Sequence, residues 1–230
     1  MKLVLFDIDG TLLNSDGAGR RAIQRALVES FGTAGPEQHW FDGKTDPQIV
    51  HELMALAGID RDVVEARLDH VFTRYVELLR DEIGRPGHAA AIYPGVAELL
   101  DALEATNGVT LGLLTGNVEA GAHVKLGAVG IAPARFRVGA FGSDHAVRAE
   151  LPAIARARAG AMLGCELPGQ AMVVIGDTPA DLTCGLGVGA RAMGVATGRY
   201  SVAELGAYQP AAVVANFRDT AAVVDAILSA

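Results

Sequence analysis

The chain opens with an apolar run that stops abruptly at two acidic residues. Residues 2–12 read KLVLFDIDGTL, so that Asp7 and Asp9 follow directly on the bulky stretch from Leu3 to Phe6. A short run of this kind is typical of a strand buried on both faces inside a parallel sheet. Such strands place functional groups just beyond their carboxyl ends, and two carboxylates that face one point repel each other unless a cation or a shared proton lies between them. The opening residues therefore predict an α/β fold with an acidic site at one edge of its sheet.

Strands and helices alternate through the second half of the chain. Helical periodicity separates the apolar runs that predict further strands, at residues 109–114, 136–140, 171–175, 191–196 and 211–214. Alternation at such short spacing implies right-handed crossovers and a parallel sheet covered by helices on both faces. The fold class predicted from this pattern is α/β with a Rossmann-like core.

A block of helices interrupts this core directly after its first strand. Helical spacing recurs in three segments, at 20–31, 46–57 and 60–79. No strand pattern occurs between them, and the polar, glycine-rich stretches 14–19 and 84–87 at either end are candidate hinges. We therefore divide the chain into a core, formed by residues 1–13 and 86–230, and an inserted all-helical cap, formed by residues 14–85.

Composition and charge restrict what this chain can bind. With 27 acidic and 19 basic side chains its net charge is -8, which argues against binding to a nucleic-acid backbone because that requires a basic face. The opening apolar run ends at Asp7, too early for a signal peptide, and no apolar stretch approaches the roughly 20 residues of a membrane helix. Two cysteines are too few for a disulfide framework or a zinc site. We expect a cytoplasmic protein that acts on a small molecule, without a nucleic-acid or membrane partner, as a monomer or a homodimer.

Three of the predicted strands end in polar clusters. These clusters are Asp7/Asp9, Thr115/Asn117 and Asp177/Asp181. Because parallel strands share one direction, the clusters converge on one edge of the sheet, where so many carboxylates require a hard cation. Magnesium takes oxygen ligands and commonly binds one or two carboxylates together with water and substrate phosphate. The alternative is that these residues only cap the helices that follow the strands, but three such clusters at once favour a magnesium site.

The same motifs resemble the signatures of the haloacid dehalogenase-like superfamily in its phosphatase form. DIDGTL at residues 7–12 is similar to the first signature, LLTGN at 113–117 to the second, and GDTPAD at 176–181 to the fourth. Their order and spacing match that superfamily, and the helical insert resembles its first type of cap. The phosphoglycolate phosphatase-like hydrolases are the subgroup that the chain resembles most. The resemblance covers essentially the whole chain and implies a magnesium-dependent phosphatase that hydrolyses a small phosphate monoester.

The resemblance also implies a role for each acidic residue. Asp7 would attack phosphorus and form an aspartyl-phosphate intermediate. Asp9 would be the general acid for the leaving alcohol and then the base that activates water, so its pKa should exceed that of Asp7. Magnesium would be bound by Asp7, Asp177 and the backbone carbonyl of Asp9. Asp181 would lie close by and support the metal or a basic residue.

Substrate contacts are expected from residues around these acids. Thr115, with backbone N–H groups nearby, would hold the transferring phosphoryl group. The turns after the strands and a loop of the cap would supply further contacts, through Gly10, Gly116, Asn117 and Lys44. Lys44 lies in the sequence DGKTD, which would be a loop that closes over the site. A solvated loop lysine is the alternative that stays open.

The third signature of the superfamily is a basic residue that neutralises the nucleophile and the phosphoryl oxygens. No lysine stands in the expected region, and Arg148, ahead of the predicted helix 151–163, is the best candidate. Lys125 is the second candidate, although it falls in the middle of the helix that follows residues 109–114. The alternative for Arg148 is a solvated arginine at a helix start.

Other activities of the same superfamily remain open at this point. A haloacid dehalogenase needs the first aspartate but no acid two residues later, so Asp9 argues against it. A phosphosugar mutase keeps both aspartates and a cap, and it is compatible with the sequence. A non-catalytic regulator on this scaffold would be expected to have lost one of the acids, and none is missing. Which phosphate ester is the substrate cannot be read from the sequence.

Overall fold

A six-stranded parallel sheet forms the centre of the molecule, and the computed structural model describes all residues from 1 to 230. In spatial order its strands are β5 (Val138–Phe141), β4 (Val109–Thr115), β1 (Lys2–Phe6), β6 (Met172–Gly176), β7 (Arg191–Val195) and β8 (Ala212–Val214). The helices are α1 (Ala18–Phe31), α2 (Asp46–Leu56), α3 (Arg61–Glu65), α4 (Leu68–Ile83), α5 (Val96–Glu104), α6 (Glu119–Ala128), α7 (Leu151–Leu163), α8 (Pro179–Cys184), α9 (Val202–Gly206) and α10 (Thr220–Ser229). None of them has both the length and the apolar character that crossing a membrane requires. The predicted α/β fold with a parallel sheet is confirmed.

Alternating side chains of the strands build a core on each face of the sheet. On β1, Val4 and Phe6 belong to a cluster with α5 and α10, whereas Leu3 and Leu5 belong to a second cluster with α7. All four side chains are fully buried, as expected for a central strand of a sheet that is covered on both sides. Helices α5, α6 and α10 therefore cover one face, and α7 and α8 cover the other.

Strand pairing determines which residues meet at the carboxyl edge of the sheet. Strand β1 pairs with β4 on one side, where Phe6 lies opposite Leu113, and with β6 on the other side, where Phe6 lies opposite Ile175. The segments that follow these three strands therefore leave the sheet side by side. This register brings the three polar clusters together.

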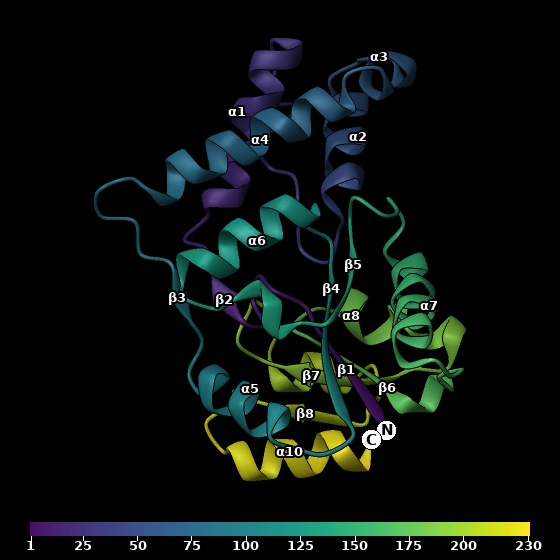
Figure 1. The fold of residues 1–230 in the computed structure, drawn as a ribbon. Helices are drawn as coiled ribbons and strands as arrows, with labels where there is room; N and C mark the ends of the chain where they lie inside the picture. The colour runs from purple at the N-terminus through teal and green to yellow at the C-terminus, as the bar shows by residue number, and fades with distance from the viewer.

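Helices α1 to α4 form a separate helical unit above the carboxyl edge of the sheet (Figure 1). They enclose a core of their own, which includes Met54 and Tyr75. The sequence pattern predicts one helix over 60–79, but the structure has two, α3 and α4, separated by Ala66 and Arg67. Both helices contribute apolar side chains to the same core, so the periodic pattern continues across the break and does not reveal it.

Two short strands join the places where the chain leaves and re-enters the core. β2 (Leu13–Asn14) and β3 (Ala91–Ile92) pair in antiparallel orientation. The sequence predicts only a hinge at 14–19 here, because a two-residue strand is too short to leave an alternating pattern. The two crossings between the core and the helical unit are therefore tied together by backbone pairing.

Candidate active site

A cavity of about 240 Å³ lies between the carboxyl edge of the sheet and the helical unit. Asp7, Thr115 and Asp177 reach it from the ends of β1, β4 and β6. Residues of the helical unit close its opposite side, among them Arg20, Phe41, Lys44, Asp46 and Tyr75. The volume lies below the range of about 300–1,000 Å³ that is usual for pockets of drug-sized ligands. The cavity therefore suits a small molecule.

Arg148 is the basic residue that contacts the predicted nucleophile. Its Nη2 donates to Oδ1 of Asp7 at 3.1 Å and also to the carboxylate of Asp181. Burial alone would lower the pKa of this guanidinium, but the charges of Asp181 and Asp7 outweigh that effect and raise it. A 3₁₀ turn at Arg148–Glu150 presents the side chain just ahead of α7. Of the two basic candidates, Arg148 is thus the one beside Asp7.

Lys125 instead lies beside Asp9. Its Nζ donates at 2.6 Å to Oδ2 of Asp9 and at 2.6 Å to Oδ1 of Asn117. The side-chain amide of Asn117 donates to the same Asp9 oxygen at 3.0 Å, and the hydroxyl of Ser15 donates to Oδ1 of Asp9 at 2.8 Å. Gly19 on α1 leaves the space that the ammonium occupies, since a Cβ there would lie 2.9 Å from Nζ. The carboxylate of Asp9 is therefore held by residues from three separate segments.

The two aspartates of the DIDG sequence have different electrostatic surroundings. Burial raises the pKa of Asp7 to about 6, against the opposing charge of Arg148. Burial also acts to raise the pKa of Asp9, but the charge and the hydrogen bond of Lys125 outweigh it and hold that pKa below its ordinary value. This order is the reverse of the predicted one, in which magnesium bound at Asp7 keeps that carboxylate ionised. The physical reason is the contact with Lys125, which the sequence does not reveal.

Carboxylates at the strand ends fit a hard divalent cation. One oxygen from each of Asp7, Asp177 and Asp181 lies within 4.8 Å of the others. Burial and the two neighbouring carboxylates raise the pKa of Asp177 to about 9, because so much negative charge is unfavourable without a counter-ion. The backbone carbonyl of Asp9 accepts no hydrogen bond within the protein, which leaves it free as a further oxygen ligand. Both the number and the type of these oxygens suit magnesium.

Asp181 accepts more hydrogen bonds than Asp7 or Asp177 does. One of its oxygens accepts from Arg148, and the other accepts from the backbone N–H and the hydroxyl of Thr178 at 3.0 and 2.6 Å. The N–H of Asp181 donates back to the Thr178 hydroxyl and completes a capping box at the start of α8. Asp181 thus caps a helix and orients Arg148, and it leaves Asp7 and Asp177 as the carboxylates available to a metal.

Hydrogen-bond donors for an anion converge on the cavity beside Asp7. The buried hydroxyl of Thr115 accepts from the side-chain amide of Asn117 at 2.8 Å, which leaves its own proton free to be donated. The backbone N–H groups of Asp9 and Gly116 belong to residues that line the same cavity, and they donate no hydrogen bond within the protein. Unpaired donors that line one cavity suit the binding of a phosphoryl oxyanion.

The two glycines that the sequence assigns to substrate contact both allow close packing. Gly10 has φ of +84°, and a Cβ there would lie 2.3 Å from Oδ2 of Asp177, so only glycine fits. A Cβ at Gly116 would lie 2.1 Å from the carbonyl oxygen of Lys44, in the loop of the helical unit. Gly116 also lines the cavity, whereas Gly10 does not. Gly10 therefore packs against the carboxylate of Asp177, and Gly116 is the glycine exposed to the cavity.

Lys44 lines the cavity, but its charge is matched within the helical unit. Its Nζ donates to the carboxylate of Glu52 and lies 3.2 Å from Nε2 of His39. His39 pairs with the same carboxylate at 2.7 Å. Contact between Lys44 and a substrate would therefore require the lysine to share or leave Glu52.

Several cavity residues from the helical unit and its entrance are absent from the sequence-based prediction. They are Ser15, Arg20, Asp46 and Tyr75. Asp46, which the sequence identifies only as a helix start, joins the unit to the core: its N–H donates to the carbonyl of Gly116 at 2.7 Å, and its carboxylate accepts from the N–H of Val118 at 2.8 Å. The other three carry no sequence signal, because their place relative to the strand ends depends on how the helical unit packs.

Known proteins share these motifs and this fold. The profile of the haloacid dehalogenase-like hydrolase family matches residues 4–185. Over 219 residues the sequence is 32% identical to the phosphoglycolate phosphatase of Rhodospirillum rubrum, an alignment that covers 90% of this chain and 85% of that protein. Among solved structures, a hydrolase from Pseudomonas syringae superposes with a TM-score of 0.73 at 20% identity and 98% coverage of each chain. CbbY from Rhodobacter sphaeroides, solved in complex with phosphate, superposes with a TM-score of 0.64 at 19% identity, covering 95% of this chain and 96% of that one. The family profile and the alignment each span most of the sequence, and the chain belongs to the haloacid dehalogenase-like hydrolases.

Proposed function

We propose that this hydrolase is a magnesium-dependent phosphatase that cleaves a small phosphate monoester through an aspartyl-phosphate. The observation that carries the proposal is that Asp7 and Asp9 face one cavity in two different surroundings. Asp7 lies beside Arg148 and a second metal-site carboxylate, whereas Asp9 is held by Lys125. This arrangement suits one carboxylate to nucleophilic attack and the other to proton transfer. The 32% identical relative is a phosphoglycolate phosphatase, which supports the same activity.

In the first step of this mechanism a carboxylate oxygen of Asp7 attacks phosphorus, and the bond to the leaving oxygen breaks. Arg148 orients Asp7, while the Thr115 hydroxyl and the Gly116 N–H bind phosphoryl oxygens. Asp9 gives a proton to the leaving oxygen. In the second step Asp9 takes a proton from a water molecule that attacks the phosphorus, so that phosphate is released and Asp7 is restored.

Asp7, Asp177 and the backbone carbonyl of Asp9 would hold magnesium in this mechanism. When bound, the ion offsets the negative charge of the phosphoryl oxygens and of the carboxylates around it. Asp7 is thereby kept ionised, which is the form that attacks. The hydroxyl of Thr11 donates to Oδ1 of Asp177 at 3.1 Å and fixes the orientation of that carboxylate.

We assign residues 14–85 to a cap and residues 1–13 and 86–230 to the catalytic core. Two hydrogen bonds across the boundary support a closed arrangement: the Thr45 hydroxyl donates to the carbonyl of Ala146 at 2.6 Å, and the N–H of Asp46 donates to Gly116. A closed cap excludes bulk water while the phosphoryl group moves to the carboxylate. The cavity of about 240 Å³ limits the substrate to a small ester, of which phosphoglycolate is the first to test.

Asp7→Asn tests the proposal. Release of phosphate from a panel of small monoesters, including phosphoglycolate, should fall by about 10³-fold or more in this variant, because the amide cannot attack phosphorus. Asp225→Asn, an exposed change on α10, is the matched control and should keep the wild-type rate. Phosphate release that persists in Asp7→Asn would contradict the proposal. A wild-type protein that interconverts sugar phosphates without net phosphate release would be a mutase instead.

A further inference from the structure

Four basic side chains line the cavity, and three of them have a carboxylate partner. Arg148 is paired with Asp7 and Asp181, Lys125 with Asp9, and Lys44 with Glu52. The fourth is Arg20, which has no carboxylate within 4 Å. The nearest acid in the adjoining loop, Asp42, is paired with Arg199 at 3.5 Å. Arg20 is therefore the one basic side chain of the cavity that makes no ion pair.

The guanidinium of Arg20 is held in a fixed orientation. It stacks on the ring of Phe41, with 3.7 Å between its central carbon and the ring centroid, and its Nη2 donates to the carbonyl of His39 at 2.8 Å. That bond is the only one that the side chain makes to the protein, so Nε and Nη1 keep their protons available. Burial lowers the pKa of Arg20 below its ordinary value, as expected for a partly desolvated cation, against the charge of Asp42. A desolvated, oriented guanidinium with free N–H groups is prepared for an anion.

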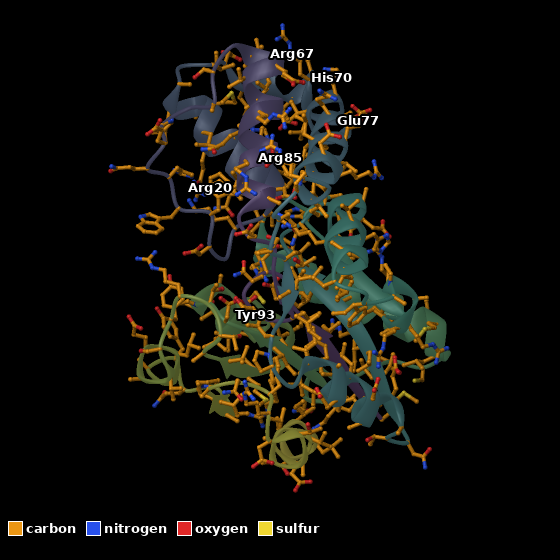
Figure 2. All side chains as sticks on the ribbon, turned by 90° about the vertical axis from the view of Figure 1, so that its left-hand side faces the viewer. Arg20, Arg67, His70, Glu77, Arg85 and Tyr93 are labelled. Atoms are coloured by element: carbon orange, nitrogen blue, oxygen red, sulfur yellow. The ribbon has the colours of Figure 1, made fainter.

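The cavity places this cation and the phosphoryl-binding groups on opposite sides. Arg148, Thr115 and the N–H of Gly116 come from the core, whereas Arg20 comes from the first turn of α1 in the helical unit. Figure 2 shows Arg20 at the end of the helical unit that faces the core. A substrate whose phosphate lies beside Asp7 would therefore extend its other end toward Arg20.

We propose that Arg20 binds a carboxylate on the leaving group and thereby selects phosphate esters that carry one. This inference rests on the proposed phosphatase function and adds to it the residue that determines selectivity. The planar fork of an arginine matches the two oxygens of a carboxylate, and the cavity of about 240 Å³ limits the ester to a small one. A neutral alcohol would leave this partly desolvated cation without a direct ion-pair partner, which is costly.

The alternative interpretation is that Arg20 has only a structural role, in which its contacts with His39 and Phe41 hold the loop of residues 39–41 against α1. The two readings differ in what they predict for selectivity. A fastening role would change all esters alike, because it acts through the shape of the cap. A carboxylate-binding role changes the ratio between esters that carry a carboxylate and esters that do not.

The experiment compares phosphoglycolate with 2-hydroxyethyl phosphate, which replaces the carboxylate by a neutral hydroxymethyl group. The wild-type enzyme should prefer phosphoglycolate, and Arg20→Gln should lower the ratio of the two kcat/KM values by about 10- to 100-fold, mainly through KM for phosphoglycolate. Arg20→Lys keeps the charge but not the fork and should lie between the two. Because the readout is a ratio within one protein sample, partial unfolding of a variant cancels out.

Arg67→Gln is the matched control. Arg67 also faces a phenylalanine ring, that of Phe31, and donates to a backbone carbonyl, that of Ser30, but it lies at the far end of the helical unit (Figure 2). Its replacement should leave the ratio unchanged. An unchanged ratio in Arg20→Gln, or a wild-type enzyme that prefers the neutral ester, would overturn the inference while leaving the phosphatase function intact. A wild-type enzyme that releases phosphate from no ester would overturn the proposed function and this inference together.

Discussion

The two aspartates of the DIDG sequence have different basic residues as ion-pair partners. Asp7 is paired with a guanidinium, that of Arg148, and Asp9 with the ammonium of Lys125. An arginine remains charged at any pH at which the protein is folded, so it stabilises developing charge without exchanging protons. Each cation lowers the pKa of the carboxylate that it contacts, but burial outweighs Arg148 at Asp7, whereas Lys125 outweighs burial at Asp9. In the proposed mechanism two basic residues therefore take the place of the single positive clamp that the sequence predicts.

Replacing Lys125 should affect proton transfer more than substrate binding. In Lys125→Met, Asp9 loses the cation that holds its pKa below the ordinary value, so that pKa rises and the acidic limb of the kcat profile moves to higher pH. We expect kcat at neutral pH to fall by about 10-fold or more, with a smaller change in KM. Phosphate release measured from about pH 5 to pH 9 tests this expectation.

Lys2→Met is the control for that measurement. Lys2 lies at the opposite edge of the sheet and donates to the carbonyls of Ile227 and Leu228. Its replacement should leave the pH profile in place. A profile that is the same in Lys125→Met and in the wild type would show that Lys125 has only a packing role.

The residues at strand ends could be predicted from the sequence, whereas among those on helices Lys125 is only a second candidate for the basic residue and Arg20 is not predicted. Asp7, Thr115 and Asp177 each follow an apolar run whose direction in the sheet is fixed by topology. Lys125 and Arg20 approach the same cavity from α6 and α1. Their positions depend on how each helix is rotated and how the helical unit packs, and neither property leaves a local pattern.

Helical periodicity predicted most elements of the helical unit because each long helix buries one face. The pattern is less informative where an element is short or where two elements share a core. It merges α3 with α4, and it gives no sign of β2 and β3. Tertiary contacts, rather than local preference, determine these boundaries.

A single buried carboxylate joins the two long helices of this unit. Glu82 on α4 is fully buried. It accepts hydrogen bonds from Arg21 and Arg25 on α1 at 2.8 and 2.9 Å and forms an ion pair with Arg85 at 2.7 Å. Burial alone would raise the pKa of Glu82, but hydrogen bonds from Arg21 and Arg25 and the charge of Arg85 outweigh it and lower that pKa. The ion cluster therefore fixes α1, the helix that presents Arg20 to the cavity.

Glu82→Gln should lower the free energy of unfolding by about 1–3 kcal/mol at neutral pH, because three arginines lose a buried counter-charge. The lower end of this range is expected, since the arginines are partly exposed and can be rehydrated. Because the pKa of Glu82 in the folded state lies below the ordinary 4.5, its stabilising effect is present above that pH and is lost as the pH falls through the folded pKa. Urea unfolding at several pH values measures both effects.

Glu77→Gln on the same helix is the matched control. Glu77 pairs with Arg74 at the surface of α4 and is about half exposed (Figure 2). Exposed pairs contribute little, so this variant should unfold like the wild type. Equal losses of stability in Glu77→Gln and Glu82→Gln would contradict the importance of the buried cluster.

At the scale of the whole molecule, the cavity beside Asp7 lies between two units that each have a core of their own. In the proposed mechanism, the core supplies the groups around phosphorus, and the helical unit supplies those around the leaving group. The chain termini lie together at the end of the molecule farthest from the helical unit (Figure 1). Substitutions in the helical unit could therefore alter substrate selectivity without altering the groups that carry out phosphoryl transfer, because the two sets come from different parts of the fold.

The crowding of carboxylates in this cavity links metal binding to stability and pH. Asp7 and Asp177 have pKa values of about 6 and about 9, both raised chiefly by burial above the ordinary 3.8. Without a cation the folded protein therefore holds protons that the unfolded chain has released. The stability that these protons provide is complete below the ordinary carboxyl pKa and is lost as the pH rises through the folded values.

We therefore expect the EDTA-treated protein to melt at a lower temperature near pH 9 than near pH 6. Magnesium takes the place of the protons, so its effect on Tm should increase with pH; at 100 times its Kd it should stabilise the fold by about 2.7 kcal/mol, or about 5–10 °C for a chain of this length. Asp177→Asn removes one of the crowded charges and should weaken both the pH dependence and the response to magnesium. A magnesium response that is equal at both pH values, or that persists in Asp177→Asn, would show that the ion binds elsewhere, since protons and metal would then not compete for the same oxygens.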